Sequence, residues 1–250
     1  MTCSGCLPRI SPKTDLSKGL AAQAFDRPSY LMLLALDTST EKGSLALVED
    51  DHLLGELSLD TPGAYLQHLL PGIQTLLEAT GRRLEDIKAI AVSQGPGNFT
   101  GLRLGVATAQ GLAWALGCPL SAVSSLEVIA AQYPYQSMPI AVLMDAKRQE
   151  VYLGLFGCAQ EAPEPLGATE RLPLARLPQR LTGPALLTGP ALESYESLLR
   201  QILPPYLSWA PPELRYPRAA ILARLGRRRL QLGLTTPPHL VQPAYLRPAL

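Results

Sequence analysis

The chain has 250 residues, of which 47% are hydrophobic and only 17% are charged. That hydrophobicity excludes a chain that is disordered throughout, because disorder needs low hydrophobicity and a high net charge. A net charge of +1, from 22 basic and 21 acidic residues, gives the molecule as a whole no marked attraction for polyanions, and no apolar run approaches the roughly 18 residues needed to cross a bilayer.

Residues 1–31 show neither strand alternation nor helical periodicity, and they lack the apolar centre of a signal peptide. Met32 stands at the start of the first predicted strand. We therefore interpret 1–31 as a disordered extension or as the result of a start assigned too far upstream. The four cysteines, at positions 3, 6, 118 and 158, do not complete a zinc site. Such sparse cysteine usage suits a reducing cytosol, so we expect a cytoplasmic protein.

The first half of the chain alternates strands and helices. Short apolar runs predict three strands, at 31–38, 44–48 and 53–59, joined by tight turns as an antiparallel meander. A helix over 64–80 follows, with its apolar stripe at 3 and 4 spacing. Further strands are predicted at 87–93 and 120–123, and further helices at 102–116 and 126–132. This order predicts an α/β fold with a mixed sheet covered by helices.

The second half begins with a repeat of the opening pattern. A strand at 140–144 ends in Asp145, a polar turn follows, and a second strand covers 151–156, as in residues 33–47. Only four prolines lie between Ser29 and Tyr133, whereas seventeen lie between Pro134 and Leu250. We therefore predict two related subdomains, 32–135 and 136–250. The stretch 160–190 is predicted to be irregular connection, followed by helices at 193–203 and 217–232.

The segment QGPGNFTGLRLG, at 94–105, is the strongest local signal. Gly95, Gly97 and Gly101 allow close backbone approach, and Thr100 is placed to cap the following helix. A helix N-terminus of this kind can hold a phosphate group. A stiff structural turn explains the same residues without a ligand.

The helix predicted at 102–116 is apolar around its whole circumference, apart from Arg103, Thr108 and Gln110. Such a helix must be buried on every side. Small residues at 101, 105, 109 and 111 would let another helix approach closely. This favours a subunit interface, with burial inside the chain as the alternative.

Two aspartates, Asp37 and Asp145, each end a predicted strand and are followed by small or polar residues. Together they could hold a hydrated magnesium ion against phosphates, or each could cap its own turn. The chain has three histidines and neither a His-Glu-x-x-His motif nor a Gly-x-Ser-x-Gly elbow. We therefore predict no protein-held metal and no catalytic residues.

The C-terminal part is basic, with seven arginines and one acidic residue after Gln201. Arg224, Arg227 and Arg228 share one face of the last predicted helix. That face could contact an RNA backbone, or it could be a solvated face that favours the helix dipole.

Several stretches together resemble the TsaB (YeaZ) family. They are LLALDTST at 33–40, LLPGIQTLLEATG at 69–81, SQGPGNFTGLRLGVATAQGLA at 93–113, SAVSSLE at 121–127, the turn 145–148 with Glu150-Val151-Tyr152, and 244–247. The family commonly has a His-Ser-Glu-like triplet where this chain has Tyr65-Leu66-Gln67-His68, so its partner contact is expected to differ locally.

The resemblance implies an actin-like (ASKHA, ribonuclease H-like) fold of two subdomains. It also implies a non-catalytic cytosolic subunit that pairs with the catalytic paralogue TsaD, joins the ATPase TsaE and serves threonylcarbamoyl transfer to tRNA. Without the paralogue, a homodimer is expected. ATP and magnesium would act through the complex. An actin-like ATP-dependent kinase and a metal-dependent hydrolase remain the alternatives.

From these patterns we select two sets of candidate residues. The expected partner interface is Leu66, Leu69, Leu70, Ile73, Gly101, Arg103, Gly105, Thr108, Ala109 and Leu112. The expected phosphate or nucleotide contacts are Asp37, Thr38, Ser39, Gly95, Gly97, Thr100 and Asp145.

Overall fold

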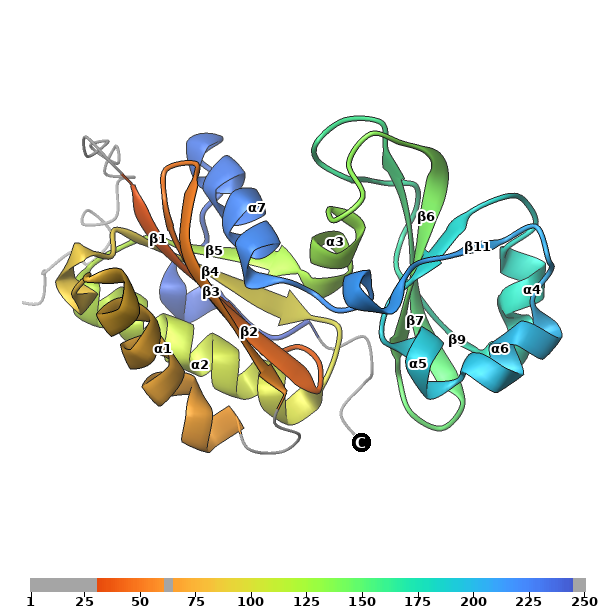
Figure 1. Cartoon of the computed structure of the whole chain (residues 1–250), viewed down its shortest axis with the longest axis horizontal. Helices are drawn as coiled ribbons and strands as arrows, with labels where there is room; N and C mark the ends of the chain where they lie inside the picture. Colours follow the sequence, from red (N-terminus) through yellow and green to blue (C-terminus); the bar gives the residue numbers. More distant parts are fainter. Residues whose placement is uncertain (1–30, 61–64, 245–250) are drawn as a thin grey trace, which may run out of the picture.

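The structure, a computed structural model, describes residues 31–60 and 65–244 and consists of two mixed β-sheets with helices packed against them (Figure 1). The predicted extension at 1–31 lies outside the described residues, apart from Leu31. The strands are β1 (Met32–Asp37), β2 (Lys42–Glu49), β3 (His52–Asp60), β4 (Ala89–Gly95), β5 (Leu120–Ser124), β6 (Gln136–Asp145), β7 (Glu150–Cys158), β8 (Glu164–Pro165), β9 (Glu170–Pro173), β10 (Leu186–Thr188) and β11 (Ser208–Trp209). The α-helices are α1 (Tyr65–Thr80), α2 (Phe99–Leu116), α3 (Ser125–Ala130), α4 (Leu177–Arg180), α5 (Ala191–Ser194), α6 (Glu196–Ile202) and α7 (Ala219–Gln231).

The two sheets share one strand order. The first runs β3-β2-β1-β4-β5. The second, read from its other edge, runs β8-β7-β6-β10-β11, with β9 also paired to β7, so that β6 and β7 correspond to β1 and β2. In the first sheet β1 is antiparallel to β2 and parallel to β4. In the second sheet β6 is antiparallel to β7 and parallel to β10. The predicted duplication and the α/β class with mixed sheets are thereby confirmed.

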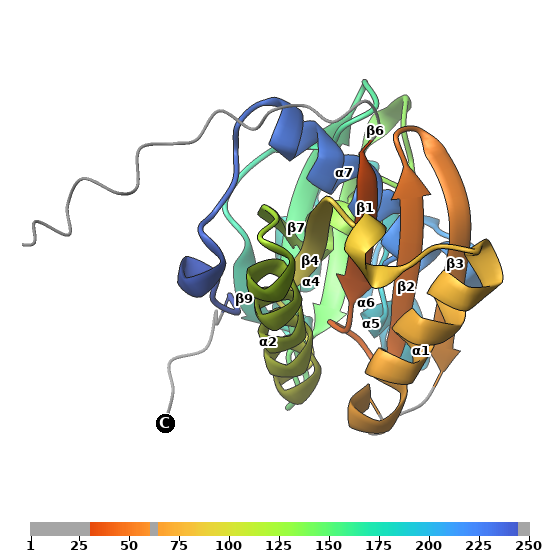
Figure 2. The same cartoon turned by 90° about the vertical axis from the view of Figure 1, so that its left-hand side faces the viewer.

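Strand β1 is buried on both faces, so the first sheet needs a helical layer on each side. Leu34 and Leu36 pack with the helices α1 and α2, whereas Leu33 and Ala35 pack with α7. Successive side chains of a strand point to opposite faces, which explains why this near-continuous apolar run serves two layers. Figures 1 and 2 show α1 and α2 side by side on one face and α7 on the other.

This placement of α7 corrects the predicted boundary at 136–250. The chain leaves the second subdomain near Tyr216, and α7 then covers the first sheet. Thr236 further on pairs with Leu120 of β5. The C-terminal part therefore belongs to the first subdomain, because α7 packs on that apolar face of β1 and β4.

Helix α3 packs against the second sheet, as α7 packs against the first. Leu126 and Ile129 pack with apolar side chains of β6 and β7, whereas Val128 faces the cluster beneath α7. The two chain crossings between subdomains meet just beyond this helix. The Gln132 amide donates to the Tyr216 carbonyl at 2.9 Å, and the Tyr133 hydroxyl donates to the Leu214 carbonyl at 2.6 Å. These bonds tie the crossings together.

Other local predictions differ from the structure. The stretch 160–190 contains β8, β9, α4 and β10, elements of two to four residues that are too short to show periodicity in sequence. The helix expected at 193–203 is divided into α5 and α6. Helix α2 begins at Phe99, and its N-cap is Asn98, whose side chain accepts the Gly101 N–H at 3.0 Å. The expectation that Thr100 caps this helix is therefore wrong.

Candidate functional site

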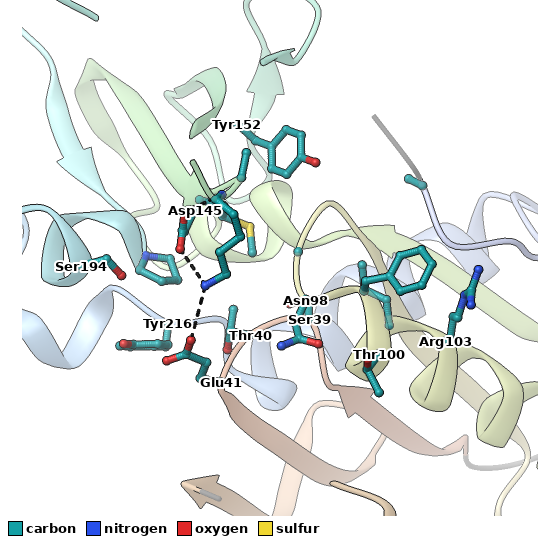
Figure 3. Close-up of a pocket in the computed structure, with 18 residues that line it drawn as sticks. Ser39, Thr40, Glu41, Asn98, Thr100, Arg103, Asp145, Tyr152, Ser194 and Tyr216 are labelled. Carbon is teal, nitrogen blue, oxygen red and sulfur yellow. Dashed lines mark hydrogen bonds and ion pairs between the residues drawn. The ribbon is translucent and has the colours of Figure 1, made fainter. Parts of the chain in front are cut away.

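A cavity of about 690 Å³ lies between the two subdomains (Figure 3). One side is the β1–β2 turn with the start of α2, and the other is the β6–β7 turn with α5. Its lining residues are Ser39, Thr40, Glu41, Gly97, Asn98, Phe99, Thr100, Leu102, Arg103, Met144, Asp145, Ala146, Lys147, Tyr152, Pro190, Ser194, Tyr216 and Ala244. This volume suits a small molecule. Of the seven candidate phosphate contacts, Ser39, Gly97, Thr100 and Asp145 line the cavity.

Asp37, at the end of β1, is fully buried and does not line the cavity. Its Oδ1 accepts the Ser39 backbone N–H at 3.0 Å and the Ser39 hydroxyl at 2.8 Å, and its Oδ2 accepts the Ser93 hydroxyl. Burial raises the pKa of this carboxyl, against the opposing effect of these hydrogen bonds. Both oxygens are thus engaged within the chain, as expected of a residue that caps its own turn.

Asp145, at the equivalent end of β6, does line the cavity. Its Oδ1 accepts the Lys147 backbone N–H at 2.7 Å and the Tyr195 hydroxyl at 2.8 Å. Its Oδ2 accepts the Lys147 ammonium at 2.8 Å. Burial acts to raise the pKa of Asp145, but the hydrogen bonds from Lys147 and Tyr195 outweigh it, and the net shift is downward. The pKa values of the two equivalent aspartates are therefore shifted in opposite directions, and only Asp145 lines the cavity, whereas a shared magnesium site needs both carboxylates to face it.

The glycine-rich loop packs directly on the β1–β2 turn. A Cβ on Gly97 would lie 2.0 Å from the Ser39 carbonyl oxygen, and one on Gly101 would lie 2.1 Å from that of Thr38. The Asn98 N–H donates to the Ser39 carbonyl at 2.7 Å. Gly95 is buried against Leu102 and does not line the cavity itself. Close packing within the chain therefore accounts for the glycines, as the structural-turn alternative expects.

Five of the residues predicted for the partner interface lie on the wrong face. Leu69 and Ile73 of α1 are in the apolar core, as is Ala109 of α2. Gly101 and Gly105 are buried against Thr38 at the end of β1. These small residues bring α2 close to its own sheet. They are not available to a second helix, and for them the alternative of burial inside the chain is correct.

The outer face of α1 and α2 retains the other candidates. Leu70 is 58% exposed, and Arg103 is exposed with its guanidinium stacked over the Phe99 ring at 3.8 Å. Thr108 and Leu112 are half-buried. The side chain of Leu66 lies outside the described set. We call the outward-facing side of these two helices the α1–α2 face.

Trp114, in the last turn of α2, is 86% exposed and adds the largest apolar side chain to this face. The segment after α7 runs beside α2 (Figure 2). The Gln110 amide donates to the carbonyls of Pro238 at 2.7 Å and Val241 at 3.0 Å, and Leu240 is 58% exposed. The sequence analysis counted Trp114 among the apolar residues of this helix but did not select it as an interface residue.

The arginines of α7 are largely engaged within the chain. Arg227 forms an ion pair with Asp51, and Arg224 donates to the Ala131 carbonyl at 2.6 Å. Arg228 is exposed. All three line a second hollow of about 720 Å³. Its acidic lining residues are Asp50, Asp51 and Glu161. The charges of this hollow therefore balance, in contrast to the uniformly basic groove typical of an RNA-binding surface.

Residues 31–60 and 65–244 contain neither a cluster of metal ligands nor a membrane-spanning helix. No three His, Cys, Asp or Glu side chains gather there in a way that could hold a metal ion. None of the helices in that part of the chain is long and apolar enough to span a membrane.

Comparison with known proteins gives consistent similarities. A family model described as TsaD, tRNA N6-adenosine threonylcarbamoyltransferase, matches residues 61–165. The "tRNA threonylcarbamoyladenosine biosynthesis protein TsaB" of Bacillus subtilis is 30% identical over 87% of this chain and 94% of its own length. The protein of the same name from Escherichia coli is 38% identical, over 49% of this chain and 53% of its own. The solved structure of YeaZ from Pseudomonas aeruginosa superposes with a TM-score of 0.74 at 30% identity, covering 86% of this chain and all of that one.

Proposed function

The chain belongs to the TsaB (YeaZ) family and has its actin-like fold, and on that premise we propose that it is a non-catalytic subunit in the synthesis of threonylcarbamoyladenosine in tRNA. Its role would be to pair with a TsaD-like catalytic paralogue and activate it. The observation that carries this proposal is the α1–α2 face, where Leu70 and Trp114 are exposed although both helices are otherwise well packed. Clusters of exposed apolar side chains are characteristic of protein interaction surfaces, and Leu70, Phe99 and Trp114 all lie on these two helices.

The match of a TsaD family model to residues 61–165 supports the choice of partner. That range contains both α1 and α2. A paralogue with the same two helices can present an equivalent face, and two equivalent faces can meet around a pseudo-twofold axis. By the same reasoning, we propose that a second copy of this chain occupies the face when the paralogue is absent.

The environments of the two aspartates support a non-enzymatic role for this chain. The carboxylate oxygens of Asp37 and Asp145 all accept hydrogen bonds from groups within the chain. We therefore propose that ATP and magnesium are bound elsewhere in the complex, by the TsaE-like ATPase and the paralogue, and that this cytoplasmic subunit meets tRNA only within that assembly. Isothermal calorimetry of the isolated chain with magnesium-ATP tests the kinase alternative, which predicts binding.

Reconstitution of tRNA modification tests the proposal. The TsaD-like and TsaE-like proteins, tRNA, ATP and the remaining substrates are incubated with and without this chain, and threonylcarbamoyladenosine is measured after nuclease digestion. We expect modification only when the chain is present. Full activity without it would refute the proposal.

Variants of exposed residues then locate the contact, because Gly105 and Ala109 are buried and their substitution would disturb the fold. We expect Trp114→Asp to abolish co-purification with the paralogue. Leu198→Asp is the matched control, since Leu198 is an exposed leucine of α6 in the second subdomain. Equal binding by both variants would exclude the α1–α2 face.

A further inference from the structure

Lys147 lies at the mouth of the cavity between the subdomains, where it is shared by two carboxylates. Its ammonium is 2.8 Å from Asp145 Oδ2 in its own turn and 3.7 Å from Glu41 Oε1 on the opposite side. The dashed lines in Figure 3 mark both ion pairs. Glu41 follows β1 in the first subdomain, and Lys147 follows β6 in the second. The second ion pair therefore crosses the cleft.

The turn that carries Lys147 has an unusual backbone. Lys147, Arg148 and Gln149 have φ values of 64°, 57° and 59°, three successive non-glycine residues in the left-handed region. Each such residue costs about 1–2 kcal/mol relative to the right-handed form. The Lys147 N–H bonds to the Asp145 carboxylate at 2.7 Å, and the Ala146 N–H bonds to the Glu150 carbonyl at 2.9 Å. Residues held in this way cluster at functional positions.

The subdomains are joined by two chain segments, one after α3 and one before α7. There the two chain crossings are bound to each other by Gln132 and Tyr133. Elsewhere in the cleft, the Lys42 ammonium lies 4.3 Å from the centre of the Tyr216 ring. A Cβ on Gly97 would lie 3.2 Å from the Met144 methyl group, so the glycine-rich loop touches β6. The cleft is thus bordered by the hydrogen-bonded chain crossings, by the contact between Gly97 and Met144, and by the ion pair between Lys147 and Glu41 at its mouth.

We propose that Glu41, Lys147 and Asp145 form an electrostatic latch that holds the two subdomains of this chain in a closed arrangement. The Asp145 carboxylate holds the Lys147 ammonium, the left-handed turn directs this side chain across the cleft, and Glu41 on the opposite side forms the second ion pair. The latch favours one position of the second subdomain relative to the α1–α2 face. It stands on this chain's own geometry and is independent of the proposed role in tRNA modification.

The strength of the latch follows from its exposure. The side chains of Lys147 and Glu41 are 67% and 63% exposed, so water and salt screen their attraction. An exposed ion pair of this kind shifts an equilibrium by about two- to fivefold. The open form should therefore become more populated by that factor when the cross-cleft pair is removed.

Hydrogen exchange of the full chain, read by mass spectrometry, tests the latch. We expect Glu41→Gln to accelerate exchange about two- to fivefold in the peptides that contain the two lips, residues 38–42 and 144–149. Raising the salt from about 50 mM to about 500 mM should do the same in the wild type and have little effect in the variant. Glu170→Gln is the control, because it removes the Arg180 ion pair within the second subdomain.

A double variant separates the latch from a general effect of charge. Once Lys147→Gln has removed the bridging cation, adding Glu41→Gln should cause no further acceleration, because the cross-cleft pair is already lost. Exchange at the two lips that is unchanged in Glu41→Gln, or that responds equally to Glu170→Gln, would overturn the proposal.

Discussion

The Thr38 side chain lies directly beneath Gly105 of α2. A Cβ on that glycine would come within 2.1 Å of the Thr38 Oγ1, and the same hydroxyl donates to the Gly101 carbonyl at 2.7 Å. The end of β1 and the first turns of α2 are therefore in contact without a side chain of α2 between them. This contact positions both the glycine-rich loop and the face that α2 turns to solvent.

A methyl group at Gly105 should disturb this contact. We expect Gly105→Ala to lower the free energy of unfolding by about 1–3 kcal/mol, the usual cost of overpacking. Gly111, on the same helix, has open space around the position of a Cβ. Gly111→Ala should therefore be neutral or stabilise by about 0.5–1 kcal/mol. Urea unfolding of both variants measures the difference, and equal stability of the two would contradict this account of α2.

Trp114 should dominate binding at its end of the α1–α2 face. A tryptophan that is exposed in the free subunit and buried in a complex typically costs 2 kcal/mol or more on truncation, so we expect Trp114→Ala to weaken binding of the paralogue about 30-fold. Surface plasmon resonance measures this loss. Thermal unfolding of the free variant should be unchanged. Wild-type affinity for Trp114→Ala would place the contact elsewhere.

The two equivalent aspartates should affect stability with opposite dependence on pH. The folded pKa of Asp37 is raised, so its favourable contribution is complete below the ordinary value of 3.8 and is lost as pH rises through the folded pKa. The folded pKa of Asp145 is lowered, so its contribution is present above 3.8 and is lost as pH falls through the folded pKa.

Unfolding measured between about pH 3 and pH 7 tests this opposition. Relative to Asp37→Asn, the wild type should lose stability as the pH rises. Relative to Asp145→Asn, it should gain stability over the same change. Parallel curves for the two pairs would show that the two carboxyls have similar environments, contrary to the structure.

The arginines of α7 allow a separate test of tRNA contact. If this helix meets tRNA, Arg228→Ala should reduce the slope of log affinity against log salt by about one, as for one lost phosphate contact. Arg227→Ala should change that slope less, because Arg227 is paired with Asp51. Filter binding at several salt concentrations measures both slopes. An absence of binding by the complete complex at low salt would remove this role.

Local patterns were sufficient to predict much of the first subdomain. The apolar run of β1, the stripe of α1 and the strand, aspartate and turn that recur at Asp37 and Asp145 are all properties of neighbouring residues. They are readable because a strand or helix imposes its period on the sequence. The second subdomain was harder to predict, since strands as short as β10 and β11 are too brief to show a period.

The sequence of this protein determined which segments form its central strands and helices and that they occur as a repeat, because these features depend on residues close together in the chain. Only the tertiary structure decided that α7 returns to the first sheet, that Gly105 faces Thr38 rather than a partner, and that Lys147 reaches across to Glu41. Each of these contacts joins residues more than sixty positions apart. An apolar or charged side chain carries no mark of which distant group it will meet, and packing around a shared core makes that choice.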